Sequence, residues 1–338
     1  MTLSVRPVIG TRAKITAVGT YVPPDVITNQ DLEKMVDTSD EWIVTRTGIR
    51  TRHKLAAGKG VSDMAVEAAR NCLQMRGIEP SEVEVVIVGT VTPDMMFPST
   101  ACLVQDKLGI KGAWGFDISA GCSGFVFSLQ AGVKLVESGA QKKVLVIGAD
   151  ANTRMTDYTD RTTCVLFGDG AGAVLIEPCE PGEIGFIDYV HEIDGSGAES
   201  LNLKAGGSLN PASHETIDKH WHFIHQDGPA VYKFAVRKMA EATAKVLERN
   251  GITGDDLCCF IPHQANLRII DATAHRLGIG PDRVIVNIEK YGNTSAGTIP
   301  LAIATAMEQG KLKKGGLVLL AAVGAGFSVG ATLLRWEI

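Results

Sequence analysis

The chain of 338 residues is 45% hydrophobic, enough to bury the core of two domains or of one large α/β unit. Its formal net charge of −5 excludes a surface that is basic overall, so we expect no nucleic-acid partner. No run of about 18 apolar residues is present, so no membrane span is predicted, and residues 1–14 lack the apolar region of a signal peptide. The seven cysteines form no C-x-x-C pair, which predicts a reducing, cytoplasmic environment and no structural zinc.

Two stretches of the chain repeat the same order of predicted elements. Residues 72–87 and 246–261 each show the end of an amphipathic helix, a Gly-Ile stop, a polar turn and a buried strand. A second helix then ends in Leu-Gly-Ile in both stretches, at Leu108 and Leu277. Each half therefore begins with the same βα pattern.

Two further pairs of predicted strands continue the duplication. They cover residues 143–148 and 316–321, and then 172–176 and 330–334. The spacing between equivalent positions falls from 174 to 158, so the first half carries about 16 extra residues before Gly172, including Arg154 and Arg161. Apolar strands in duplicated βαβα halves predict an α/β fold with parallel or mixed sheets buried under helices. We expect one half in residues 1–180, the other in 181–338, and the ligand site at the seam between them.

Two glycine-rich segments resemble dinucleotide-binding loops, at residues 168–172 and 324–330. Each leads into a strand pattern instead of a helix, and no acidic residue follows at the distance that a ribose contact requires. The sequence therefore predicts no dinucleotide site.

Cys122 follows a strand-like run and stands among small residues at the start of a helix pattern. The unpaired N–H groups of a helix start favour a thiolate and can lower a cysteine pKa to roughly 3.5–7.5. Taken alone, such a cysteine is more often a small buried thiol than a nucleophile. The alternatives are decided by the partners that the fold brings to it.

His263 and Asn293 are the partners that the duplication predicts. His263 ends a buried strand, at the position equivalent to Thr90 or Val91 in the first half. Asn293 is roughly equivalent to Cys122, since the two are 171 positions apart. The other histidines fall in polar segments; His222 and His225 have a spacing that suits a metal, but no third ligand is evident, and we expect no metal site.

Cys, His and Asn together fit two kinds of chemistry. A thiol hydrolase of the papain type places its His and Asn about 130–150 residues after the Cys, and His263 lies 141 residues after Cys122. The C-G-x-C-W signature is missing, however, and a duplicated chain is foreign to that architecture. The other chemistry is acyl transfer with formation of a carbon–carbon bond.

From about Ile15 to Trp336 the chain resembles the thiolase superfamily, and within it the β-ketoacyl-acyl carrier protein synthases III. The matching segments are 37–49, 262–270 and 292–295, together with Cys122. Thiolases carry a second cysteine in the last glycine-rich loop, and this chain has no cysteine there. Elongating synthases combine their cysteine with two histidines, whereas the third residue here is Asn293. The resemblance implies a thiolase-like fold, with the two halves forming a layered αβαβα core.

The resemblance also implies a two-step reaction without a cofactor. Cys122 takes the acetyl group from acetyl-CoA; malonyl-acyl carrier protein then loses CO₂, and its enolate attacks the acetyl group to give acetoacetyl-acyl carrier protein, initiating fatty acid synthesis. His263 and Asn293 would donate hydrogen bonds to the enolate, and the N–H groups of Cys122 and of the 324–326 turn would hold the oxyanion.

Further residues are implied by the same resemblance. The CoA or phosphopantetheine chain would contact Trp42, Arg46, Arg161 and Asn266. A basic patch for the acidic carrier protein would contain Lys233, Arg268 and Arg276. Phe97 would wall the acyl pocket of the partner in a homodimer.

Three features depart from the family pattern. Val323 stands where many relatives carry Phe, Ala325 replaces a glycine, and residues 209–227 look longer and more aromatic than in short relatives. We therefore keep open a related condensing enzyme that takes longer primers for a specialised product, and, as a weaker alternative, a Cys-His-Asn thiol hydrolase.

Overall fold

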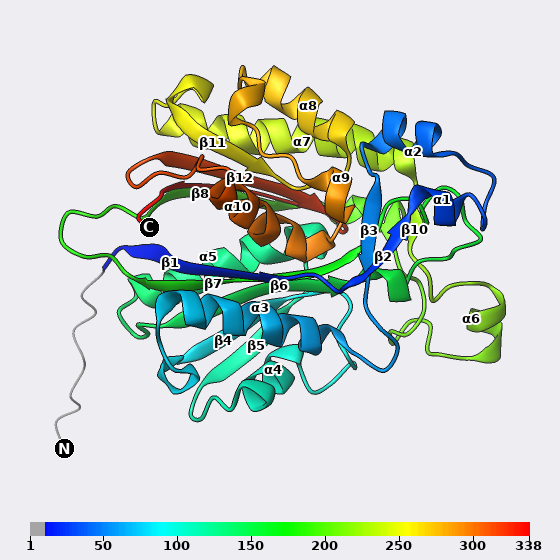
Figure 1. The fold of residues 1–338 in the computed structure, drawn as a ribbon, viewed down its shortest axis with the longest axis horizontal. Coiled ribbons are helices and arrows are strands. Elements are labelled where there is room, and N and C mark those ends of the chain that lie inside the picture. Colours follow the sequence, from blue (N-terminus) through cyan, green and yellow to red (C-terminus); the bar gives the residue numbers. More distant parts are fainter. Residues whose placement is uncertain (1–10) are drawn as a thin grey trace.

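The computed structural model describes residues 11–338; residues 1–10, most of the segment inspected for a signal peptide, lie outside the described part. The chain forms five layers, helices alternating with two sheets (Figure 1). The outer helices are α3 (Val61–Arg76) and α4 (Thr100–Leu108) on one side, and α7 (Gly228–Arg249) and α8 (Leu267–Arg276) on the other. The αβαβα fold expected from the resemblance is confirmed.

The first sheet is mixed and has the strand order β1-β7-β6-β4-β5. β4 runs parallel to both β5 and β6, and the two remaining strands are antiparallel to their neighbours. The strands are β1 (Ala13–Tyr21), β4 (Val85–Gly89), β5 (Trp114–Ile118), β6 (Val144–Ala151) and β7 (Asp169–Pro178). The carboxyl ends of the parallel strands therefore meet at one edge, where a ligand is expected.

The second sheet repeats this order as β8-β13-β12-β11. Its strands are β8 (Phe186–Ile193), β11 (Leu257–Pro262), β12 (Leu317–Gly324) and β13 (Ser328–Arg335). The counterpart of β5 is reduced to a single bridge between Phe260 and Val284. The predicted duplication of strands is confirmed.

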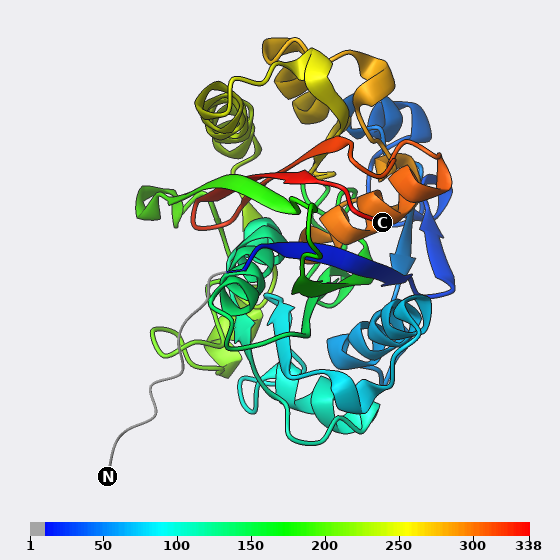
Figure 2. The ribbon, with the colours of Figure 1, turned by 90° about the vertical axis from the view of Figure 1, so that its left-hand side faces the viewer.

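Two helices fill the layer between the sheets, α5 (Gly124–Glu137) and α10 (Thr298–Glu308), as the turned view in Figure 2 shows. Their apolar side chains and those of both sheets form one core cluster. Glycines in β4 and β6 let the helix starts approach: a Cβ at Gly89 would lie 2.7 Å from the Gly124 backbone, and one at Gly148 only 2.2 Å from the Ala296 carbonyl oxygen. These contacts hold both helix starts against the carboxyl edge of the first sheet.

Short elements gather at one end of the layers, to the right in Figure 1. They are β2 (Asp25–Thr28), α1 (Asn29–Leu32), α2 (Asp40–Thr47), β3 (Thr51–Lys54), β9 (Leu201–Asn202), α6 (His214–Asp218), β10 (His225–Gln226) and α9 (Ile288–Tyr291). Residues 209–227 are therefore not all loop, because they contain α6 and β10. Neither glycine-rich segment leads into a helix: Gly168 precedes β7, and residues 324–330 span the β12–β13 turn.

No helix within residues 11–338 is both long and apolar enough to cross a membrane.

Candidate active site

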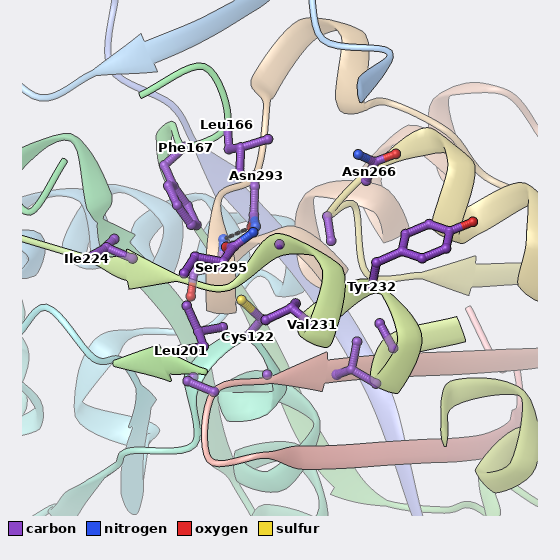
Figure 3. A pocket seen from close by; sticks show the side chains of 18 of the residues that line it. Cys122, Leu166, Phe167, Leu201, Ile224, Val231, Tyr232, Asn266, Asn293 and Ser295 are labelled. Carbon is purple, nitrogen blue, oxygen red and sulfur yellow. Dashed lines mark hydrogen bonds between the residues drawn. The ribbon is translucent and has the colours of Figure 1, made fainter. Parts of the chain in front are cut away.

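A cavity of about 560 Å³ opens at the seam between the two halves (Figure 3). Cys122, His263 and Asn293 all line it, although they come from distant parts of the chain. The structure thus brings together the three side chains singled out by the sequence.

Cys122 lies in a 3₁₀ turn, Gly121–Ser123, that leads directly into α5. Its side chain is 9% exposed. The expectation of a lowered pKa was wrong: burial raises the pKa of Cys122 to about 11, against hydrogen bonds from Ser295 and Asn293, and the negative charge of Asp150 raises it further. The free protein therefore holds a protonated thiol at physiological pH.

Asn293 follows α9 and is held by its backbone and by one end of its side chain. Its N–H donates to the Leu166 carbonyl at 2.9 Å, and its own carbonyl accepts from Gly168 N–H at 3.0 Å. Its side-chain oxygen accepts the Ser295 N–H at 2.9 Å, the dashed contact in Figure 3. The amide NH₂ takes no part in this contact and lies within hydrogen-bonding reach of Cys122.

His263 follows β11, and its backbone N–H donates to Ala321 at 2.7 Å. The strand registers make its position equivalent to that of Gly89 in the first half, one residue before Thr90. The ring is 2% exposed, and its Nδ1 has no hydrogen-bond partner among the described residues. Burial lowers the pKa of His263 to about 3, so the imidazole is neutral at physiological pH.

The backbone beside Cys122 comes from the β12–β13 turn. A Cβ at Gly324 would lie 2.6 Å from the Cys122 nitrogen, and one at Gly121 2.6 Å from the Ala325 nitrogen. Two backbone N–H groups thus lie close together at the cavity wall, which is the arrangement that an oxyanion site needs.

Asp150, at the end of β6, is a buried residue that the sequence did not single out. Its carboxylate accepts hydrogen bonds from Val91 N–H at 2.8 Å and from Ala296 N–H at 2.9 Å. It therefore joins the loop after β4 to the turn after Asn293. The one feature of the sequence that could have indicated it is a charged residue at the end of an otherwise apolar strand.

Trp42 and Arg46, both on α2, line the cavity, and Arg161 lies next to its lining residue Thr162. The guanidinium of Arg46 lies 5.1 Å from the Trp42 ring centroid, and that of Arg161 lies 4.6 Å from it. Asn266 also lines the cavity, but its amide already caps α8 through Arg268 N–H and donates to the Arg46 carbonyl.

The residues expected to contact a carrier protein lie on two neighbouring helices. Lys233 is on α7 and Arg268 and Arg276 are on α8, and all three are exposed. Arg268 also lines the cavity mouth and lies 5.7 Å from the Tyr232 ring centroid. Phe97 is 85% exposed and does not line the cavity of its own chain.

No group of three or more potential metal ligands occurs within residues 11–338. His222, half of the pair with metal-like spacing, contacts the Thr216 hydroxyl through Nε2 at 2.9 Å.

Two family profiles match the chain. The profile of 3-oxoacyl-[acyl-carrier-protein (ACP)] synthase III matches residues 116–195, and that of its C-terminal part matches residues 247–336. The two matches contain Cys122, His263 and Asn293.

Relatives match over nearly the whole length. A β-ketoacyl-[acyl-carrier-protein] synthase III of Koribacter versatilis is 67% identical over 96% of this chain and 98% of its own. The crystal structure of 3-oxoacyl-[acyl-carrier-protein] synthase III from Aquifex aeolicus is 44% identical, with a TM-score of 0.88, over 96% of this chain and all (100%) of that one. A priming β-ketosynthase from the R1128 polyketide pathway is 33% identical, with a TM-score of 0.91, over 99% of both chains. The chain therefore belongs to the 3-oxoacyl-[acyl-carrier-protein] synthase III family of acyltransferases.

Proposed function

We propose that this enzyme condenses acetyl-CoA with malonyl-acyl carrier protein and so initiates fatty acid synthesis. The observation that carries the proposal is the meeting of Cys122, His263 and Asn293, contributed by both halves, in one cavity. Family membership and the close relatives support the same reaction. No cofactor is required, because a thiol and neutral hydrogen-bond donors suffice for the chemistry.

The first step transfers the acetyl group. The Cys122 sulfur attacks the thioester carbonyl, CoA leaves as the thiol, and the proton from Cys122 goes to the departing sulfur. Because burial raises the pKa of this thiol and lowers that of His263 to about 3, the imidazole is a weak base, and the proton passes to the departing sulfur without resting on His263. The N–H groups of Cys122 and Ala325 would stabilise the oxyanion.

The second step forms the carbon–carbon bond. The carbon–carboxylate bond of the malonyl group breaks, CO₂ leaves, and its electron pair forms an enolate. The enolate carbon attacks the acetyl carbonyl, and the Cys122 sulfur leaves as a thiolate to give acetoacetyl-acyl carrier protein. The thiolate then takes up a proton from water, which restores the thiol. The free NH₂ of Asn293 and a neutral His263 would both donate to the enolate oxygen, and neither adds a positive charge that must be removed afterwards.

The long substrates need contacts outside the reacting centre. We propose that Trp42, Arg46 and Arg161 receive the nucleotide end of CoA, with the base replacing one guanidinium on the indole face. Asn266 would meet the pantetheine only by giving up a hydrogen bond that it now makes. Lys233, Arg268 and Arg276 would bind the acidic carrier protein.

A homodimer is the assembly that we propose. β5 is an edge strand of the first sheet, and its Trp114 is 48% exposed. Met96 and Phe97, which precede α4 beside it, are 75% and 85% exposed. An apolar edge of this kind favours pairing with a second copy, which would place Phe97 at the partner's acyl pocket. We also propose the division into halves at residue 180 and a cytoplasmic location.

The direct test is mass spectrometry of the protein after incubation with acetyl-CoA. The expected result is one acetyl group on the Cys122 peptide, removed by malonyl-acyl carrier protein with release of the β-ketoacyl product. Removal of the acetyl group by water alone would instead identify a thiol hydrolase.

A longer primer is the second candidate, favoured by the apolar walls of the cavity. Its lining includes Leu201, Ile224, Val231, Phe234 and Phe327. We expect turnover of octanoyl-CoA as well as acetyl-CoA by the unmodified enzyme, and strict preference for acetyl-CoA in comparative rate measurements would exclude this candidate.

Val323→Phe is expected to shorten the acyl pocket. Val323 is 6% exposed and lines the cavity, so an added ring must fill space that a long acyl chain would use. We predict a fall of about 10-fold or more in the octanoyl rate, whereas the acetyl rate stays within about threefold. Equal losses with both primers would show that the ring disturbs the centre itself.

Arg268→Glu is expected to weaken carrier binding. A reversed charge at the cavity mouth should raise the KM for malonyl-acyl carrier protein by about 10-fold at low salt and leave the rate of acetylation by acetyl-CoA unchanged. Arg70→Glu, the same reversal at an exposed position of α3, serves as the control and should change neither value. An equal rise for both variants would indicate only a general effect of charge.

A further inference from the structure

Asp150 is fully buried near the carboxyl end of β6, where the two halves meet. Oδ1 accepts from the Thr90 hydroxyl at 3.0 Å, from Val91 N–H at 2.8 Å and from the Thr92 hydroxyl at 3.0 Å. Oδ2 accepts from Ala296 N–H at 2.9 Å. One carboxylate therefore binds a loop of the first half and a turn of the second.

The directions of these hydrogen bonds favour a negative charge on Asp150. The Thr90 oxygen already accepts Thr92 N–H at 3.1 Å, and the Thr92 oxygen accepts Ala151 N–H at 2.8 Å. Each hydroxyl hydrogen is thus left to point at Asp150. Burial raises the pKa of Asp150, whereas the hydrogen bonds from Ala296 N–H, Val91 N–H and the Thr92 hydroxyl lower it and so stabilise the carboxylate.

The contact with Ala296 reaches Asn293 within the same turn. Ser295, between them, has φ +51°, a conformation that residues other than glycine seldom adopt. The N–H of Ser295 holds the Asn293 side-chain oxygen at 2.9 Å, and its hydroxyl lies within hydrogen-bonding reach of both Asp150 and Cys122. A strained turn persists only when its surroundings fix it, and Asp150 supplies that fixation.

The duplication gives an independent reason for this role. Helices α5 and α10 begin at Gly124 and Thr298, 174 positions apart. The strand registers relate β6 to β12 by the same spacing, because Gly148 pairs with Gly172 as Ala322 pairs with the equivalent Gly330. Cys122 therefore corresponds to Ala296, and Asp150 corresponds to Gly324. Where Asp150 binds Ala296 N–H, the equivalent Gly324 lies against the Cys122 nitrogen, with 2.6 Å to a built Cβ. A side chain fits in only one of the two places.

The chain thus contains two equivalent N–H groups at the starts of its two central helices. In one place no side chain intervenes, and the N–H of Cys122 is left for the reacting oxygen. In the other the carboxylate of Asp150 occupies the equivalent position permanently. We propose that Asp150 is a positioning residue: a built-in anion that fills the second, non-catalytic helix start and thereby aims the Asn293 amide at the enolate. This inference rests on the proposed function, since it assigns Asp150 to the condensation step.

Asp150→Asn tests the inference, because it keeps the side-chain size but turns one acceptor into a donor. The new NH₂ group opposes either Val91 N–H or Ala296 N–H, so the turn that carries Asn293 must shift. The condensation rate of the pre-acetylated enzyme should fall by about 10²-fold or more, whereas the rate at which acetyl-CoA acetylates Cys122 should stay within about fivefold. Both half-reactions are followed by mass spectrometry.

Asp169→Asn is the matched control. Asp169 is also fully buried and accepts three hydrogen bonds, from Leu55 N–H and from the N–H and hydroxyl of Thr153, but it does not line the cavity. Asp169→Asn should lower the rates of acetylation and condensation by the same factor, because it affects only the stability of the fold. The inference is wrong if Asp150→Asn also slows both equally, or if Asp169→Asn shows the same selective loss.

Two further outcomes are separable from these. If the unmodified enzyme forms no acetyl-Cys122, the proposed function itself fails. If Asp150→Asn does not fold, Ser295→Ala replaces it, since this variant removes the hydroxyl that lies beside both Asp150 and Cys122. A selective loss of condensation in the folded Ser295→Ala protein supports the inference, and unchanged condensation overturns it.

Discussion

Replacing Cys122 by alanine is expected to eliminate the acetyl-enzyme and to lower the condensation rate by about 10⁴-fold or more. No other described cysteine lines the cavity, so no neighbouring thiol can accept the acetyl group. The change removes only one sulfur atom, next to the cavity at the start of α5, so we expect the fold to be retained. Intact-mass measurement after incubation with acetyl-CoA checks the first effect, and product formation checks the second.

Cys72→Ala is the control for this prediction. Cys72 is fully buried in α3, and burial raises the pKa of its thiol to about 12, so its local chemistry resembles that of Cys122. It lies away from the cavity, and its loss should leave acetylation intact. Acetylation retained in Cys122→Ala would refute the assignment of the nucleophile.

The fold could be predicted from the sequence because the duplication shows as the same local patterns of helix ends and apolar runs in both halves. The Gly-Ile stops after Arg76 and Arg249 mark the ends of α3 and α7, and the apolar runs between them and the next turns become β4 and β11. Such signals depend on neighbours in sequence, so no knowledge of packing is needed to use them.

The electrostatics of the site could not be predicted in the same way. A helix start alone suggests a lowered pKa for Cys122, but the desolvation that raises it arises from residues far away in the chain, including those of the β12–β13 turn. Asp150 was missed for the same reason: its importance lies in contacts with Val91 and Ala296, 59 and 146 positions away.

The equivalence of the two halves was also only partly predicted. The sequence places Asn293 near the position of Cys122, whereas the helix starts make Ala296 its counterpart. Asn293 precedes Ala296 by three residues. The turn at Ser295, whose N–H binds the Asn293 side-chain oxygen, holds the Asn293 side chain in the cavity. Two equivalent frameworks thus bring a thiol and an amide to the same cavity.

His263→Ala is expected to lower the condensation rate by about 10²–10³-fold, because one of two donors to the enolate is lost. Acetylation of Cys122 should fall by less than about 10-fold if His263 serves mainly as that donor. Since the pKa of His263 is lowered to about 3, its ring stays neutral from pH 5 to 8, and the condensation rate of the unmodified enzyme should show no inflection near pH 6.5 that belongs to this group. Single-turnover rates of the pre-acetylated enzyme across this pH range measure both effects.

Asn293→Asp supplies the comparison that isolates hydrogen-bond donation from packing. The aspartate can still accept the Ser295 N–H, so the turn is retained, but it places an acceptor and a negative charge where the NH₂ group stood. Condensation should fall at least as far as in His263→Ala, whereas acetylation should persist. If His263→Ala instead loses both half-reactions equally while Asn293→Asp loses only condensation, His263 acts chiefly as the proton acceptor for Cys122, and Asn293 remains the principal donor to the enolate.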